Sequence, residues 1–148
     1  KRNKSPKRSN ARNADNMITL NELGYYKDMD LEHYNNLLKL SEKINKLRET
    51  YGKPLRVTSG YRSLEKHLSI YAAKGITDQK KIPMQSRHLS GLAVDLVPVK
   101  EPIEDFHKWI EDNVELLEEI GLWLEDFKYS KTWAHFQIVA PKSGKRER

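Results

Sequence analysis

Residues 86–97 read SRHLSGLAVDLV, and this stretch predicts the centre of the fold. Its second half is rich in the aliphatic residues that favour a β-strand, and Leu92, Val94 and Leu96 share one face of that strand. Asp95 falls on the opposite face. Because an unpaired charge in a protein interior is costly, the Asp95 carboxylate needs a partner that compensates it.

The sequence around this strand predicts a single domain of the α+β class. A capping box at Thr19–Glu22 predicts a helical turn at the start of the ordered region. An apolar stripe that recurs every three or four residues predicts a long helix, with Asp30 as its N-cap and Gly52 after its end. We expect a small, largely antiparallel sheet with about three helices packed on it and a hairpin at its end. The expected helices cover residues 31–51, 64–74 and 102–120, the expected strands cover 55–58, 92–97, 122–128 and 132–139, and a surface loop covers 76–90.

Composition excludes several classes of site. The chain has 148 residues, a length typical of one domain. It contains no cysteine, which excludes disulfides, thiolate zinc sites, iron–sulfur clusters and cysteine nucleophiles. No run of even a dozen apolar residues occurs, so the sequence predicts no membrane-spanning helix.

The net charge of +6 is concentrated at the two ends of the chain. Residues 1–14 carry six basic side chains and no acid, and residues 141–148 carry a further net +3, which leaves a net charge of −3 on residues 15–140. We interpret the chain as a flexible basic arm, a folded domain and a basic tail, at residues 1–16, 17–140 and 141–148.

This division of charge shapes the expected partners. A basic protein invites a nucleic-acid interpretation, but the mildly acidic domain does not support it, and only the tails could contact nucleic acid or an anionic cell wall. The arm contains no apolar segment typical of a signal peptide. We expect a monomer.

Two of the five histidines stand out as candidate metal ligands. His88 lies just before the strand of Asp95, and His135 lies inside the last expected strand. Two ligands close in sequence and a third from a distant strand are common in catalytic zinc sites, where the fourth position holds a water that becomes a hydroxide nucleophile. The alternative from spacing is a His–Asp hydrogen bond in a polar layer of the core. We interpret His33, His67 and His107 as surface or helix-packing residues.

Three motifs in order carry a family resemblance: VTSGYRS at 57–63, SRHLSGLAVD at 86–95 and WAHFQ at 133–137. The set resembles the zinc peptidase family that contains D-alanyl-D-alanine carboxypeptidases, D-Ala-D-Ala dipeptidases and L-alanyl-D-glutamate endopeptidases of cell-wall and phage (endolysin) origin. The family pattern is Ser-Gly-Tyr-Arg, then Ser-x-His-x-x-Gly-x-Ala-x-Asp, then a late His followed closely by Glu or Gln. The resemblance spans about residues 19–138.

The resemblance implies a zinc-dependent metallopeptidase that hydrolyses amide bonds in peptidoglycan stem peptides. It implies that His88, Asp95 and His135 are the zinc ligands and that Arg62 stabilises the developing oxyanion. Gln85 and Ser86 lie before the first ligand and are expected to bind the substrate backbone or its terminal carboxylate. Hydrogen bonds within the loop are the alternative role of Gln85 and Ser86. A wall substrate implies action outside the cytoplasm, in the cell wall or periplasm, or in a phage.

One position departs from the family pattern. Many members carry Glu or Asp three residues before the last ligand as the general base, and here that residue is Thr132. We expect the base to come from the preceding strand, where Asp126 and Glu125 are the candidates. Residues 123–127 resemble the Trp-x-x-Asp-aromatic stretch of the endopeptidase branch, and this resemblance favours Asp126. Otherwise the branch tolerates the loss of a base, since zinc itself activates the water, or the protein is a non-catalytic, zinc-containing module that binds the cell wall.

Overall fold

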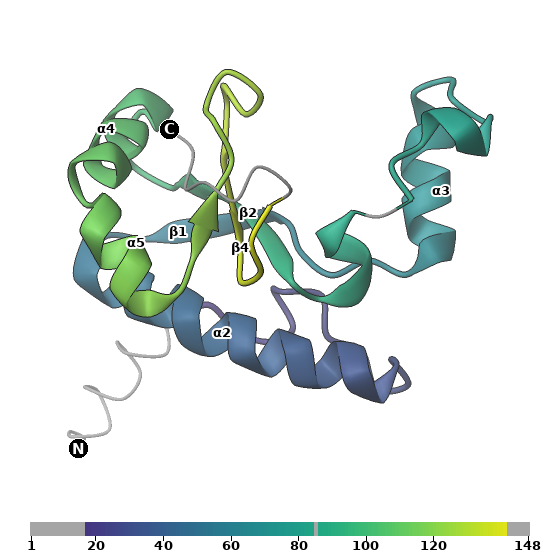
Figure 1. Cartoon of the computed structure of the whole chain (residues 1–148), viewed down its shortest axis with the longest axis horizontal. Coiled ribbons are helices and arrows are strands. Elements are labelled where there is room, and N and C mark those ends of the chain that lie inside the picture. Colours follow the sequence, from purple (N-terminus) through teal and green to yellow (C-terminus); the bar gives the residue numbers. More distant parts are fainter. Residues whose placement is uncertain (1–16, 85, 142–148) are drawn as a thin grey trace, which may run out of the picture.

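A four-stranded antiparallel sheet with the strand order β1-β2-β4-β3 forms the centre of the protein (Figure 1). The computed structural model describes residues 17–84 and 86–141, so the predicted arm, Gln85 and nearly all of the basic tail lie outside the described residues. The elements are β1 (Leu55–Ser59), β2 (Ala93–Pro98), β3 (Trp123–Leu124), β4 (Ala134–Gln137), α2 (Leu31–Tyr51), α3 (Leu64–Ala73), α4 (Ile103–Asp112), α5 (Val114–Ile120) and the 3₁₀ helices η1 (Gln79–Lys81) and η2 (Arg87–Ser90).

The α+β class, the antiparallel sheet and the long helix are confirmed. Helix α2 begins after Asp30, whose side chain accepts a hydrogen bond from the backbone N–H of His33, and it ends at Gly52 in the left-handed conformation. The predicted capping box is present, since the Thr19 N–H donates to Glu22 and the Glu22 N–H donates to Thr19. It closes a turn rather than a regular helix.

The predicted helix over residues 102–120 is divided into α4 and α5. Asn113 interrupts it with φ −125° and ψ 32°, and its side-chain amide donates to the Trp109 carbonyl oxygen at 2.7 Å. This bond takes an acceptor that the next helical turn would use, which favours an end to α4. Pro102 is the N-cap of α4 and not its first helical residue.

Two other predicted segments also differ in detail. The expected loop at 76–90 contains η1 and η2, and η2 holds His88. The hairpin is present, but its strands β3 and β4 are shorter than predicted, because a turn at residues 127–132 occupies the ends of both.

Side chains of the two central strands alternate between a buried face and an open face. Val94 and Leu96 of β2 and Phe136 of β4 are fully buried against residues of α2, α4 and α5. Asp95 and His135 are cross-strand partners in the register and point to the opposite face. Figure 1 shows α2 running along the sheet, α4 and α5 at one end of the molecule and α3 at the other.

The described part of the chain contains no helix of the length and hydrophobicity needed to cross a membrane.

The turn after β1 packs tightly against the first described segment. The Tyr61 N–H donates to the Leu23 carbonyl oxygen at 2.7 Å, and Leu23 is fully buried. A Cβ atom on Gly60 would overlap that same carbonyl oxygen, which belongs to backbone and cannot rotate away. Gly60 is therefore required by close approach of two backbone segments.

We expect Gly60→Ala to lower the free energy of unfolding by at least about 2 kcal/mol, because the two segments must separate. Gly75→Ala is the matched control: its φ is +82°, but nothing lies within 4 Å of the added Cβ, so only about 1 kcal/mol of backbone strain is expected. Denaturant unfolding measures both changes. An equal or smaller loss for Gly60→Ala would contradict the close packing of this turn.

Candidate metal centre

His88, Asp95 and His135 form one group on the open face of the sheet. One ligand atom from each residue lies within 4.8 Å of the other two. The Asp95 Oδ1 atom lies 2.7 Å from His135 Nδ1 and 3.4 Å from His88 Nε2. The structure thus brings together the three residues that the sequence selects as candidate ligands.

The η2 turn directs His88 toward the strands. The Ser86 side chain caps η2 by accepting a hydrogen bond from the His88 N–H, and Gly91 ends it with φ +78°. A Cβ on Gly91 would lie 2.7 Å from the His33 carbonyl oxygen of α2, so only glycine fits between η2 and that helix.

Both imidazole rings are oriented by hydrogen bonds on the side away from Asp95. His88 Nδ1 lies 3.0 Å from the Gly60 carbonyl oxygen, which can only accept, so Nδ1 carries the proton and Nε2 presents its lone pair to Asp95. His135 Nε2 lies 2.8 Å from Gln137 Oε1. The Gln137 amide nitrogen donates to the Val139 carbonyl oxygen, which directs Oε1 at His135 and leaves the lone pair on His135 Nδ1.

This arrangement fits a zinc ion. Two imidazole lone pairs and one carboxylate oxygen converge, and three acceptors that face one another need a proton or a metal ion between them. Imidazole nitrogen and carboxylate oxygen are typical ligands of catalytic zinc, with a fourth position left for water or substrate. The groups behind the rings have the arrangement that supports metal-bound histidines in proteins.

The electrostatics of the group favour a cation. When no metal ion is bound, a proton can occupy the space between Asp95 and each facing ring nitrogen in its place. Burial raises the pKa of Asp95, but the hydrogen bonds that His135 and His88 then donate outweigh it and hold the pKa at about 2. Burial lowers the pKa of His135, and the hydrogen bond to Asp95 outweighs this, so its pKa is raised. Asp95 is therefore ionised at neutral pH and attracts positive charge.

Glu125 directly follows the neighbouring strand β3, next to this group. In the register of β3 and β4, Trp123 pairs with Gln137 and Leu124 with Phe136. The Glu125 N–H donates to the His135 carbonyl oxygen at 3.3 Å, which continues the pairing. This bond places the backbone of Glu125 beside that of His135 at the end of β3.

The environment of Glu125 differs from that of an ordinary surface acid. Burial raises its pKa, and the carboxylates of Asp95 and Asp126 raise it further, while His135 and His88 lower it. Each member of the candidate metal group therefore interacts electrostatically with Glu125.

Asp126, which the sequence favours as the general base, is bonded to Lys128. Its Oδ1 accepts a hydrogen bond from the Lys128 N–H at 2.9 Å, and its Oδ2 lies 4.0 Å from Lys128 Nζ. These contacts form the turn that follows β3. Thr132 is exposed in the turn before β4.

Arg62 is joined to the metal group through the backbone. Its N–H donates to the His88 carbonyl oxygen at 3.1 Å, which places the turn after β1 next to η2. Its Nε is buried and has no hydrogen-bond partner among the described residues. A buried donor without a partner is costly in free energy, so this Nε–H can bond to an incoming oxygen.

The remaining histidines stay outside the group, as predicted. His33 Nδ1 bonds to the Tyr61 hydroxyl, and His107 Nε2 bonds to the Trp133 carbonyl oxygen. His67 is buried, and its Nε2 bonds to the Pro83 carbonyl oxygen.

Sequence reasoning missed the groups that orient the two rings. A backbone carbonyl such as that of Gly60 leaves no signal in a sequence. Gln137 could have been found, because it lies two residues after His135 on the same face of one strand.

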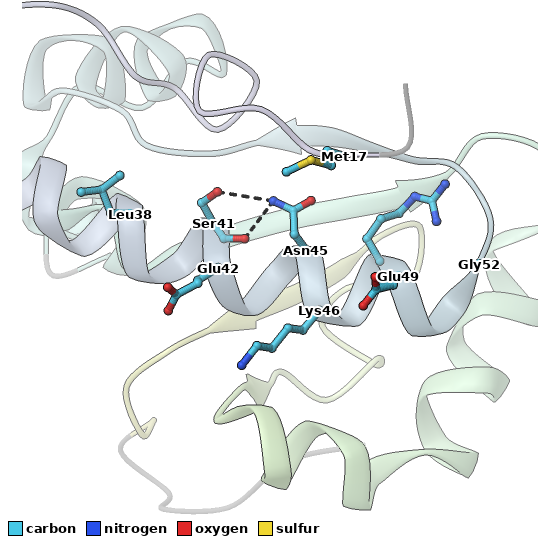
Figure 2. A pocket seen from close by; sticks show the side chains of 9 residues that line it. Met17, Leu38, Ser41, Glu42, Asn45, Lys46, Glu49 and Gly52 are labelled. Atoms are coloured by element: carbon cyan, nitrogen blue, oxygen red, sulfur yellow. Dashed lines mark hydrogen bonds between the residues drawn. The ribbon is translucent and has the colours of Figure 1, made fainter. Parts of the chain in front are cut away.

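A separate cavity of about 630 Å³ lies along α2, on the outside of the helix that covers the buried face of the sheet (Figure 2). Met17 lies over it, and the neighbouring Ile18 N–H donates to the Asn45 side chain. Asn45 in turn donates to Ser41, as the dashed lines show. Its lining contains Glu42 and Glu49 but no histidine, and it has no contact with the metal group.

Comparisons with known proteins agree with this geometry. A family model described as Peptidase M15 matches residues 14–123, which include His88 and Asp95. The crystal structure of the L-Ala D-Glu endopeptidase ChiX of Serratia marcescens is similar, with 23% identity and a TM-score of 0.50 over 86% of this chain and 100% of that chain.

A second solved structure is more distant. It is a mutant of the vancomycin-resistance D,D-pentapeptidase VanY, from a VanB-type resistance cassette, in complex with Zn(II). Its identity is 21% and its TM-score 0.41, over 85% of this chain and 82% of that chain. No curated protein gives a significant match to the chain.

We expect Gln137→Leu to weaken Zn(II) binding by about 10–100-fold, because His135 loses the acceptor that fixes its tautomer. Gln137→Glu is the matched control, since its carboxylate still accepts from His135 Nε2–H, and its affinity should stay close to that of the wild type. Competition with a chromophoric chelator measures both. Equal affinities for Gln137→Leu and the wild type would show that Gln137 does not orient the ligand.

Proposed function

Because this chain belongs to the peptidase M15 family, whose cofactor is zinc, we propose that it hydrolyses amide bonds in peptidoglycan stem peptides with zinc held by His88, Asp95 and His135. The observation that carries the proposal is the convergence of two imidazole lone pairs and an ionised carboxylate on one point of the open face. Zinc supplies a Lewis acid that polarises the scissile carbonyl and lowers the pKa of the attacking water.

Arg62 is the candidate for stabilising the oxyanion. Its backbone bond to His88 places the side chain in the turn next to the first ligand, and its buried Nε–H lacks a partner among residues 17–84 and 86–141. A donor prearranged for a developing negative charge lowers the barrier without further reorganisation. Ser86 and Gln85, which precede His88, are proposed to bind the substrate backbone.

Glu125 is the candidate general base. Its backbone bond to His135 and its electrostatic interaction with all three candidate ligands support this role, whereas Asp126 is engaged in the turn with Lys128. Glu125 would take a proton from the attacking water and pass it to the leaving amine. The C–N bond then breaks, and the products are a carboxylate and an amine.

The stem peptide is proposed from the family and from the three sequence motifs. The bond is the D-Ala-D-Ala bond or the L-Ala-D-Glu bond, and the similar Serratia marcescens enzyme is an endopeptidase for the second. A wall substrate places the action outside the cytoplasm, and we propose that the protein acts there as a monomer.

We expect the wild type to bind one zinc ion per chain and to release peptides or D-Ala from purified peptidoglycan. His88→Ala removes one of three ligands, so zinc content and product release should both fall to background. Metal analysis and mass spectrometry of the soluble products measure the two outcomes. Full zinc content in His88→Ala would show that the ion lies elsewhere, and zinc binding without any turnover would indicate a non-catalytic wall-binding module.

We expect Glu125→Gln to lower kcat by about 10²–10⁴-fold with zinc content unchanged, because the amide cannot accept the proton. Asp126→Asn is the matched control, and its effect should be less than about tenfold because only a turn contact changes. A larger loss for Asp126→Asn than for Glu125→Gln would reverse the assignment. A rise in activity for Thr132→Glu would indicate instead that the general base belongs at position 132, three residues before His135, as in many family members.

A further inference from the structure

A cavity of about 550 Å³ lies where η2, the start of α3 and the first turn of α2 meet. It is a different space from the cavity along α2 in Figure 2, and the two share no lining residue. Its lining includes Arg87, His33 and the hydroxyl groups of Ser63 and Ser86.

This cavity adjoins both turns of the metal centre. Within residues 86–90, every residue except His88 lines it, while His88 faces Asp95. Tyr61 and Ser63, the neighbours of Arg62, line it as well. A ligand in the cavity would therefore contact the segments that hold the first metal ligand and the candidate oxyanion residue.

The charge of the lining selects for an anion. Arg87 is exposed, and its guanidinium makes no ion pair or hydrogen bond with another described residue. None of the described residues that line the cavity is Asp or Glu. An arginine without a competing acid binds a carboxylate with two parallel hydrogen bonds.

Two hydroxyl groups add donors to the same space. Ser63 Oγ accepts a hydrogen bond from the Lys66 N–H, and Ser86 Oγ accepts one from the His88 N–H. Each hydroxyl keeps its own proton for donation, and a carboxylate has the lone pairs to accept both. Leu64 and Met84, which are 50% and 37% exposed, give the cavity an apolar side for the carbon atoms of a peptide.

We propose that this cavity is a substrate subsite that binds a free carboxylate of the stem peptide through Arg87, with Ser63 and Ser86 as additional donors. The inference rests on the proposed function for the identity of the ligand. It makes Arg87 a specificity residue that selects anionic peptides over their amidated forms.

The test uses the zinc-loaded full chain and three synthetic pentapeptides of sequence L-Ala-γ-D-Glu-L-Lys-D-Ala-D-Ala. Both candidate scissile amides are N-methylated, so the peptides resist hydrolysis. One peptide has both carboxylates free, one has the D-Glu α-carboxylate as an amide, and one has the C-terminal carboxylate as an amide. Isothermal titration calorimetry gives Kd for the wild type, for Arg87→Gln and for Lys66→Gln, which removes an exposed charge outside the cavity.

We expect Arg87→Gln to raise Kd for the free peptide by at least about tenfold, and Lys66→Gln to change it less than twofold. One amidated peptide should bind the wild type as weakly as the free peptide binds Arg87→Gln and should not respond to the mutation, and its identity assigns the carboxylate. Equal Kd values for Arg87→Gln and the wild type, an equal loss for all three peptides, or no binding of the free peptide would overturn the subsite.

The outcome is separable from that of the proposed function. If Arg87→Gln binds the peptides as the wild type does while the wild type still hydrolyses peptidoglycan, only the subsite fails. If binding depends on Arg87 but the wild type hydrolyses no peptidoglycan, the subsite stands and the proposed function fails. Thermal unfolding of Arg87→Gln checks that the exposed substitution leaves the fold intact.

Discussion

The alternation of side chains along β2 and β4 is the constraint on which the rest of the protein depends. Even-numbered residues such as Val94 and Phe136 enter the core, and the odd-numbered Asp95 and His135 face the other way. Because the side-chain period of a strand is two, a slip of one residue would put a carboxylate in the core and aliphatic groups in the metal centre. The hydrophobic core therefore sets the register, and the register assembles the site.

The metal centre is oriented by groups outside it. The Gly60 carbonyl oxygen holds the proton on the far nitrogen of His88, and Gln137 does the same for His135. These two partners come from the turn after β1 and from β4, so the rings are fixed by separate parts of the fold. Rings that are already oriented lose little conformational freedom when they bind an ion.

Local signals allowed most of the fold to be predicted, because caps and apolar stripes act within a few residues. Asp30 and Gly52 define α2 to the residue. The break at Asn113 depends on one side-chain bond within an otherwise continuous apolar stripe, so the pattern could not reveal it. The motifs select the ligand group, but the choice between Glu125 and Asp126 needs the residue at which β3 ends and the turn with Lys128 begins, which the motifs do not reveal.

The strand order has a consequence for biosynthesis. β4 follows β2 and β3 in the chain, yet it lies between them in the sheet, and it carries His135. In a nascent chain that has not reached Ala134, β2 and β3 both lack the strand that joins them. Such a chain has only two of the three candidate ligands. Translation of β4 therefore joins β2 to β3 and completes the metal centre in a single event, and a chain still on the ribosome before that point has no complete site with which to act.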